Sequence, residues 1–315
     1  MEKRTIIRLV LCALIFLPSF LGAEEMGLSD TALPQALEGD GSKGVFFSLL
    51  VPGGGQFYNA QYLKGGTVLA FEAVTGGIAY HWAREARTRD RRADLLRDSV
   101  NFYKELQNNT GLDESALTQA RNGQVYYSIL TSQAQFQSRE ARFRSYNALS
   151  WMGGGYVFSV LDALEHSGIL THEVNRDPAM AAGLAAIPGL GLGQIYNGSY
   201  SKAGLMIMTQ VSLGLTAYNY HRLMRDASRQ YSIMQNPNSD ENMFSSEFLR
   251  YWKGRYDSAF SNRNTYLWYS LFFYLYSIVD AVVDAHLSDF PEKTRILPDL
   301  ALSSEHVALS FSFDL

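Results

Sequence analysis

The chain carries one unusual glycine-rich stretch twice. The first copy, PGGGQFYNAQYLKGG, begins at Pro52, and the second, PGLGLGQIYNGSYSKAG, begins at Pro188. We call residues 52–66 the first motif and residues 188–204 the second motif. Aligned on their glutamines, the motifs share residue types at paired positions: Gln56 and Gln194, Tyr58 and Tyr196, Asn59 and Asn197, Tyr62 and Tyr200, Lys64 and Lys202, Gly66 and Gly204. Such a repeat predicts a fold built from two copies of one structural unit.

Both motifs open a unit with the same order of segments. An apolar segment follows the motif, a charged insert comes next, and a second apolar segment closes the unit. The units are expected at 44–170 and 179–290, with helices at 66–83, 146–164, 203–221 and 265–287 and inserts at 84–145 and 222–264. Apolar residues in the inserts recur at helical spacing, which predicts amphipathic helices. The fold class is therefore mainly α, with two tandem helical hairpins.

The two ends of the chain differ from the repeated units. Residues 1–23 have a basic start, an apolar run and a small-residue end, as in a secretory signal peptide with cleavage after Ala23. The acidic segment 24–43 is expected to be flexible, and the alternating pattern in 291–315 predicts a short β-hairpin. Cys12 is the only cysteine and lies in the signal peptide, so the mature chain would lack cysteine nucleophiles and cysteine metal sites.

The four apolar segments are about as long as a ~30 Å hydrocarbon core requires. Arginines gather in the inserts, whereas the mature N-terminus and the link between the units are acidic or neutral. The positive-inside rule then places both inserts in the cytoplasm and the N-terminus, link and tail outside the inner membrane. An exported helical bundle with buried hairpins is the soluble alternative. The final alternating run VALSFSF leaves outer-membrane association as a further alternative.

Glycines beside an aliphatic run suggest a phosphate-binding loop, but the details argue against one. A Walker loop requires Ser or Thr directly after its lysine, whereas Lys64 precedes Gly65 and Lys202 precedes Ala203. We interpret the motifs instead as helix breaks with close packing. The net charge of −4 gives no reason to expect a nucleic-acid partner, and no cofactor is expected.

The acidic ends of the closing helices allow two interpretations. Asp280 and Asp284 share one helix face with His286 just beyond, and Asp162 is the counterpart of Asp280. These groups suit a metal or proton site. Alternatively, the carboxylates pair with Lys64 and Lys202 or cap the amides of the motifs.

Two polar residues stand in the middle of apolar segments, Glu72 in the first unit and Gln210 in the second. Such residues mark an interhelical contact or a transport pathway. The candidate packing or ion site comprises Gln56, Tyr58, Asn59, Lys64, Glu72, Asp162, Gln194, Tyr196, Asn197, Lys202, Gln210, Asp280, Asp284 and His286.

The pattern PG-x-GQ-x-YN-x-x-Y-x-K, followed by a helix ending VDAVVDAHLSDF, resembles domain-of-unknown-function family 5683. The resemblance implies an exported or membrane-associated protein of the Gram-negative bacterial envelope. The first unit departs from it at LDALEHSG, which keeps Asp162 but lacks the Asp-Ala-His-Leu ending. The motifs are also similar to the two-helix membrane hairpin domain family.

These features favour an integral membrane protein of the cell envelope with a non-enzymatic structural or partner-binding role. Its expected partners are membrane lipid and other envelope proteins. The alternative is a small transporter or an ion- or proton-handling protein that uses the acidic helix ends, because duplicated units commonly enclose such sites. No catalytic constellation is recognisable, and an enzyme is the third alternative.

Overall fold

The structure, a computed structural model, describes residues 41–108, 111–169, 176–236, 245–288, 297–302 and 307–312. The predicted signal peptide and most of the segment 24–43 lie outside these residues. Within them the chain is mainly helical and contains two tandem units. The first unit comprises α2 (Gly41–Leu50), α3 (Gly54–Tyr58), α4 (Tyr62–Gln107) and α5 (Glu114–Glu165). The second comprises α6 (Pro178–Ala185), α7 (Leu192–Tyr196), α8 (Tyr200–Gln235) and α9 (Ser245–Leu287).

Two strands follow the second unit, β1 (Leu297–Leu302) and β2 (Val307–Ser312). Their backbones pair antiparallel, with Leu297 opposite Ser312 and Leu302 opposite Val307.

Each unit repeats the same path. A short helix stops just before the motif, a five-residue helix follows inside it, and a long helix begins at its end. Left-handed glycines allow these breaks: Gly53 (φ 84°) precedes α3, and Gly191 (φ 56°) precedes α7. A Cβ at Gly53 would lie 2.7 Å from the carbonyl oxygen of Gly65, so this position excludes any other residue.

The long helices do not end where the apolar segments meet the inserts. α4 continues from the apolar segment into the insert without a break at residues 83 and 84, and α5, α8 and α9 are equally continuous. No glycine or proline interrupts residues 78–107, and arginine, glutamate and leucine favour helix. Each apolar segment and its insert are therefore one helix, of which α5 is about 78 Å long.

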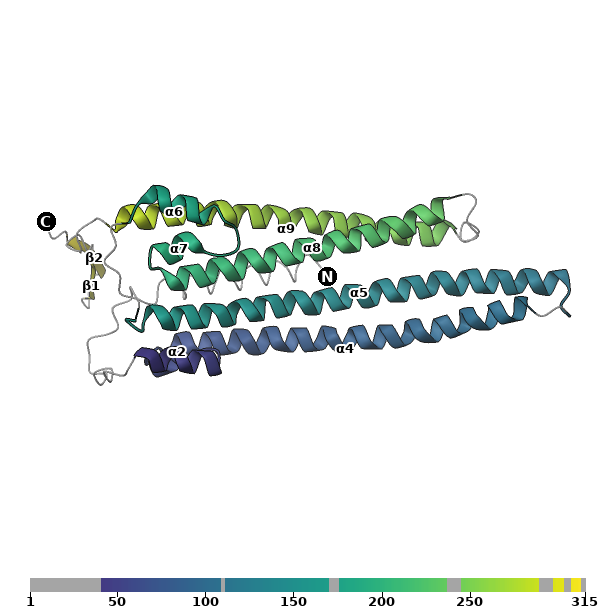
Figure 1. Cartoon of the computed structure of the whole chain (residues 1–315), viewed down its shortest axis with the longest axis horizontal. Helices are drawn as coiled ribbons and strands as arrows, with labels where there is room; N and C mark the ends of the chain where they lie inside the picture. Colours follow the sequence, from purple (N-terminus) through teal and green to yellow (C-terminus); the bar gives the residue numbers. More distant parts are fainter. Residues whose placement is uncertain are drawn as a thin grey trace.

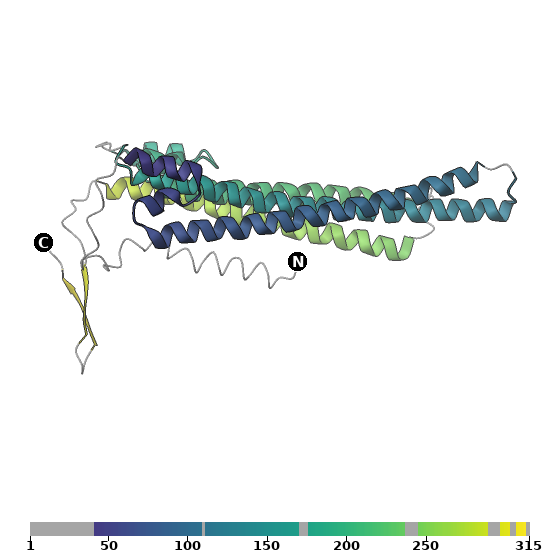
Figure 2. The ribbon, with the colours of Figure 1, turned by 90° about the horizontal axis from the view of Figure 1, so that it is seen from below.

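The four long helices lie side by side along one rod, in the order α4, α5, α8, α9 (Figure 1). α5 packs against α4 on one side and α8 on the other, while α9 packs on α8. α4 and α9 form the two flanks and do not pack against each other over the described residues. A view turned by 90° shows the same elongated rod, with both motifs at one end (Figure 2). We call this the motif end, and residues 84–145 and 222–264 the arm.

The arm has the larger apolar core. Trp252 is fully buried and meets Phe136 edge to face at 5.3 Å, with Ile129 and Met234 buried nearby. At the motif end small side chains are buried instead, among them Ala181, Ala185, Ala281 and Ala285 around α6 and α9. Small residues permit close helix approach, so the two ends of the rod pack by different means.

By length and composition, one of the described helices could cross a membrane. It is α9 over Ser246–Leu287, with a mean hydropathy of 1.4 in its most apolar window. Only 11% of that window is buried, unlike the core helix of a soluble protein.

Candidate functional site

The first motif is fixed to the end of α5 through Gln56. This side chain is fully buried, and its amide nitrogen donates to the carbonyl oxygen of Ser159 (2.9 Å) and to Oδ2 of Asp162 (2.7 Å). The hydroxyl of Ser159 accepts from the backbone N–H of Gly53 (2.8 Å) and donates to Oε1 of Gln56 (3.1 Å). Both ends of the glutamine amide are thus used inside the protein.

Asp162 is the centre of this arrangement and is fully buried. Its Oδ1 lies 2.6 Å from Nζ of Lys64 and accepts from the hydroxyl of Ser201 at 2.7 Å. A buried carboxylate requires such partners, because an isolated charge in the interior is costly. The ammonium and the carboxylate cancel, so this site is close to neutral.

Ser201 belongs to the second unit, so Asp162 also joins the two units. The backbone N–H of Ser201, in the first turn of α8, donates to Oε2 of Glu165 at 2.5 Å. The first amides of a helix have no intrahelical partner, and the helix dipole favours negative charge there. The acidic end of α5 therefore caps α8.

The second motif makes equivalent contacts with α9. The amide of Gln194, also fully buried, donates to the carbonyl oxygen of Ser277 (2.8 Å) and to Oδ2 of Asp280 (3.2 Å). Asn197 adds a contact for which no counterpart is described in the first unit, a hydrogen bond from its Nδ2 to the carbonyl oxygen of Ala281 (2.7 Å).

The charge balance differs between the two units. Nζ of Lys202 lies 2.6 and 2.8 Å from the two oxygens of Asp284 and 3.6 Å from Asp280, so one cation serves two carboxylates. In the first unit His166 occupies the position of Asp284, and its ring Nδ1 lies 2.8 Å from the carbonyl oxygen of Asp162. Burial lowers the pKa of Lys202, but hydrogen bonds and charges of Asp284 and Asp280 outweigh it and raise that pKa above its usual value.

The remaining aromatic candidates lie at the edge of the motifs. Tyr58 is partly exposed and stacks on Phe47 at 5.4 Å between ring centroids. The hydroxyl of Tyr196 accepts from the backbone N–H of Asp177 at 3.1 Å. These contacts attach α2 and α6 to their motifs.

The mid-helix pair has diverged. Oε1 of Gln210 accepts from the backbone N–H of Gly189 at 2.5 Å, so this side chain holds the second motif. Oε1 of Glu72 is buried against α5 beside Gly155 and has no hydrogen-bond partner among the described residues.

Two other candidates stand apart from the network. Asn59 lies close to Gly44 in α2, since a Cβ added at Gly44 would lie 3.1 Å from the amide oxygen of Asn59. His286 is exposed, and none of the side-chain hydrogen bonds or ion pairs found in the described part of the chain includes it.

Serine hydroxyls are the functional groups that sequence reasoning left out of the candidate set. Ser48 accepts from the backbone N–H of Gly55 at 2.9 Å, and Ser159, Ser201 and Ser277 complete the contacts described above. The repeat places Ser159 and Ser277 at matching positions, which was the available signal. Ser201 has no such signal, because its counterpart in the first unit is Leu63.

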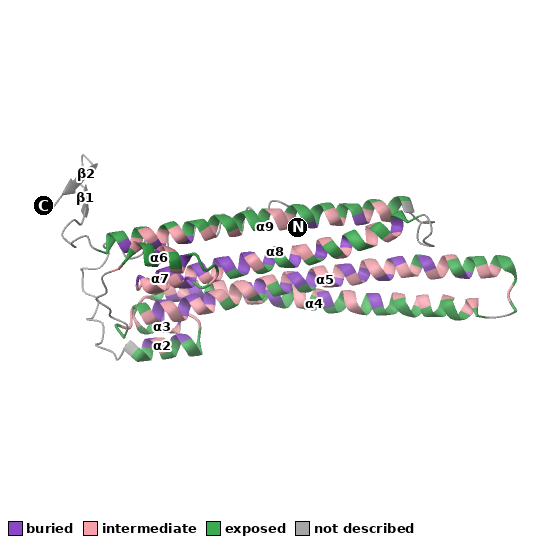
Figure 3. Ribbon diagram, turned by 45° about the horizontal axis from the view of Figure 1, so that its top comes forward, coloured by how far each residue is buried: buried purple, intermediate pink, exposed green. Residues whose placement is uncertain are grey.

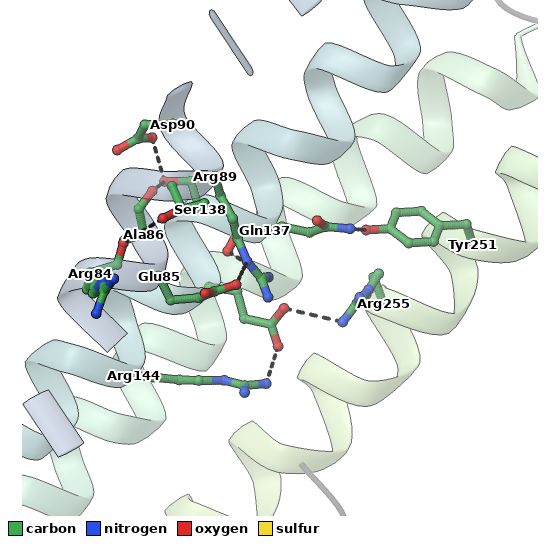
Figure 4. A network of polar contacts seen from close by, with 12 residues as sticks. Arg84, Glu85, Ala86, Arg89, Asp90, Gln137, Ser138, Arg144, Tyr251 and Arg255 are labelled. Carbon is green, nitrogen blue, oxygen red and sulfur yellow. Dashed lines mark hydrogen bonds and ion pairs between the residues drawn. The ribbon is translucent and has the colours of Figure 1, made fainter. Parts of the chain in front are cut away.

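A second polar network ties the arm together across α4, α5 and α9 (Figure 4). Ser138 on α5 donates to Asp90 on α4, and Asp90 also pairs with Arg142 at 2.8 Å. Glu140 joins Arg144 (2.7 Å) to Arg255 of α9 (3.3 Å). These contacts align the arm helices.

Over the described residues, no group of three or more His, Cys, Asp or Glu side chains is placed to hold a metal ion. The lysine–aspartate clusters are surrounded by bonds to their own chain. Chemically, they can hold the motifs against the closing helices and can exchange a proton in the second unit, where one carboxylate is in excess.

The fold and these clusters define a class of protein: a tandem repeat of long helical hairpins, each closed by a glycine-rich motif locked onto an acidic helix end. A family profile described as a family of unknown function (DUF5683) matches residues 38–182 and again residues 174–308. The chain therefore belongs to this family, with one copy for each unit, and the predicted membership and internal repeat are confirmed. No curated protein and no solved structure matches the chain. The similarity to the membrane hairpin family stays a prediction.

Proposed function

We propose that the chain is a non-enzymatic integral membrane module of the bacterial cell envelope. In this proposal the stretch between the motifs and the arm lies in the bilayer, the motif end faces the outside, and the arm extends into the cytoplasm, where it binds partners. The observation that carries the proposal is a band of exposed, large apolar side chains between the motifs and the arm, most extensive on α9. Figure 3 shows exposed positions along the whole length of α9. The band includes Leu63, Leu69 and Val74 on α4, Tyr146 and Leu149 on α5, Val211 and Leu215 on α8, and Leu267, Trp268, Phe272 and Val279 on α9.

The height of this band fits a bilayer. From the start of α4 to the first arginine at residue 84 the helix rises about 33 Å, close to the ~30 Å of a hydrocarbon core. Phe272 and Val279 are 63% and 61% exposed, and side chains of this kind gain stability by leaving water.

Arginines mark one level of the rod where the band ends. The guanidinium of Arg144 on α5 lies 4.4 Å from the ring centroid of Trp82 on α4, and that of Arg222 on α8 lies 5.0 Å from Phe143. Arg263 on α9 approaches Met224 of α8 at 3.3 Å. Cations and aromatic rings at one level are typical of the cytoplasmic face of a membrane protein.

The motif clusters support a structural role over catalysis. Gln56, Lys64 and Asp162 bond to one another or to Ser159 and Ser201, which leaves these groups engaged inside the protein. Such saturated polar networks rigidify a fold.

Labelling of single cysteines with a membrane-impermeant maleimide tests the proposal. The background is the full chain with Cys12→Ser, and the probes are Thr88→Cys in the arm, Phe272→Cys in the band and Leu287→Cys at the motif end, all at exposed positions. We expect Leu287→Cys to react in intact cells, Thr88→Cys to react only after the inner membrane is opened, and Phe272→Cys to react only in denaturant. Labelling of Thr88→Cys from outside contradicts the topology, and labelling of Phe272→Cys in membranes contradicts insertion.

A second function, ion or proton handling, is favoured by the excess carboxylate at Lys202 and by Oε1 of Glu72, which has no hydrogen-bond partner in the described part of the chain. Asp280→Asn and Asp284→Asn separate the two proposals. Variants that only lose stability support the structural role. Folded variants that lose a cation- or proton-dependent flux in vesicles support ion handling.

A further inference from the structure

The contact between α5 and α8 joins the two units inside the chain. It runs antiparallel, from Arg139 with Asp226 in the arm (3.3 Å) to Ser201 with Glu165 at the motif end (2.5 Å). Midway, Nδ2 of Asn219 donates to Oδ1 of Asn147 at 2.6 Å. This contact brings the closing helix of one unit against the first long helix of the next.

The repeat implies that both partners of this contact occur a second time. α4 is the counterpart of α8, and α9 is the counterpart of α5. Among the described residues, no closing helix packs on the equivalent face of α4, and no further long helix packs on the equivalent face of α9. These two faces lie on the opposite flanks of the rod (Figure 1). We call them the α4 flank and the α9 flank.

Side chains on the flanks are exposed at positions whose counterparts in the other unit are buried. Ser212 of α8 is fully buried, while its counterpart on the α4 flank, Val74, is 59% exposed. Phe158 of α5 is 5% exposed, while its counterpart on the α9 flank, Tyr276, is 42% exposed. The counterparts of buried contact residues are therefore apolar and open.

The flanks are complementary in size near the motif end of the contact. Inside the chain, a Cβ at Gly204 would lie 2.7 Å from Cα of Phe158, so glycine admits the neighbouring helix. The corresponding flank pair is Gly66 with Tyr276, and a Cβ at Gly66 would have no atom within 4 Å. The flank pair therefore keeps the small-to-large match and leaves room for it.

About one helical turn further along, the small and the large residue of the pair change places on the two helices. The internal pair is Gly154 on α5 with Met208 on α8, where a Cβ on the glycine would lie 2.5 Å from the methionine Cγ. The flank pair is Phe272 on α9 with Ala70 on α4. A large residue replaces the small one on one helix and a small residue replaces the large one on the other, which conserves volume in a packed contact.

The charges of the arm agree with this pairing. The counterpart of the Arg139–Asp226 pair sets Asp257 of the α9 flank opposite Thr88 of α4. Arg84 and Arg91 are exposed on either side of Thr88, and Asp257 is exposed on α9. Opposite charges at an interface set its register, whereas lipid tails would not match them.

We propose that the α4 flank binds the α9 flank of a second copy of this chain, in the geometry of the internal α5–α8 contact. The association is head to tail, because one copy offers α4 and the other offers α9. Head-to-tail contacts close into a ring when the rotation between copies allows it. The inference rests on the repeat and holds whether or not the rod lies in a membrane.

Disulfide cross-linking in cells tests the contact with a matched internal control. In the Cys12→Ser background, Asn147→Cys/Asn219→Cys reports the internal contact, and His81→Cys/Thr265→Cys places cysteines at the corresponding flank positions, both exposed. We expect oxidation to leave the first variant as a monomer with an internal disulfide, and to join the second variant into dimers and larger covalent species on a denaturing gel. His81→Cys/Leu267→Cys, whose second cysteine faces a different side of α9, is expected to remain monomeric.

A space-filling variant supplies an independent readout. Gly66→Trp adds a large ring on the α4 flank at a position where a Cβ would meet no atom within 4 Å. The helix content and melting temperature of the monomer should therefore stay close to those of the wild type, while cross-linking of His81→Cys/Thr265→Cys should fall at least tenfold. Absence of cross-linking while the internal control oxidises fully would overturn the proposal and leave the flanks to lipid. Equal cross-linking through Leu267→Cys, or cross-linking that persists with Gly66→Trp, overturns it as well. Maleimide labelling of Leu149→Cys, an exposed position on α5 that lies on neither flank, reports insertion separately, so failure of either proposal can be recognised.

Discussion

Replacing Lys64 by methionine removes the cation from the Lys64–Asp162 pair while keeping most of its apolar stem. The side chain of Asp162 is fully buried and that of Lys64 is 15% exposed, so water cannot replace the lost ammonium. Asp162 would keep only Gln56 and Ser201 as partners.

Removal of one member of a buried ion pair costs about 3–5 kcal/mol. The partial exposure of Lys64 and the remaining bonds of Asp162 place the expected loss near the lower end, at about 3 kcal/mol. This loss lowers the ratio of folded to unfolded protein by roughly 100-fold.

The assay is reversible unfolding of the purified full chain in detergent micelles, followed by far-UV circular dichroism. The control is Arg97→Met, which breaks the Arg97–Asp94 pair, whose side chains are 56% and 67% exposed. Such a surface pair contributes about 0–1 kcal/mol. Asp162→Asn and the double variant with Lys64→Met complete a thermodynamic cycle. We expect the second substitution to cost at least about 1 kcal/mol less in the background of the first, because residues in contact are not additive. Additive effects, or a loss no larger than that of Arg97→Met, would refute this reasoning.

Three further predictions concern the motifs and their clusters. Gly193→Ala should destabilise the chain by about 1–3 kcal/mol, because the new Cβ would lie within 2.8 Å of three atoms. The control Gly183→Ala in α6 meets nothing within 4 Å and should be neutral or stabilising, and thermal unfolding of both variants measures the difference. Ala60 has the left-handed conformation (φ 61°) that Gly198 has in the second unit (φ 74°). Because this conformation is strained for alanine, Gly198→Ala should lower the free energy of unfolding by about 1–2 kcal/mol, whereas Ala60→Gly should not lower it. Equal losses for the two variants in denaturant titrations would contradict this expectation. The folded-state pKa of Lys202 is raised, so the contribution of this lysine to stability is fully present below pH ~10.4 and is lost as pH rises through the folded-state pKa. The difference in unfolding free energy between wild type and Lys202→Met should therefore be constant near neutral pH and should narrow above pH ~10.4. A difference that widens at high pH refutes the pairing.

The repeat made much of the architecture predictable. Pro52 and Pro188 with the glycines behind them indicated helix breaks, and the structure ends α2 and α6 just before them. The continuous length of α4 was less apparent, because a change from apolar to charged residues resembles a boundary. A change from apolar to charged residues alters only the surroundings of a helix. A helix ends at a residue that disfavours helical backbone.

The candidate site was predictable in kind but not in detail. Pairing of Lys64 and Lys202 with the acidic helix ends was one of the interpretations that the sequence left open. The sequence does not say that Lys202 lies closer to Asp284 than to Asp280, a difference of about one ångström. The role of Ser201 depends on how one unit packs on the other, and the local pattern around it contains no trace of that contact. The predicted membrane topology stays a prediction.

The cap that Asp162 and Glu165 provide for α8 has a consequence for the order in which the chain is assembled. These carboxylates precede Ser201 by only 39 and 36 residues. During synthesis the N-terminal part of a chain folds first, so the first hairpin, with Lys64 already on Asp162, is complete while the second is still being made. Its acidic end then meets the first turn of α8 as that turn emerges, and the short separation keeps the entropy of closure small. The first unit would serve as a template on which the second begins its long helix, and a chain in which the two units were exchanged would lack that starting point.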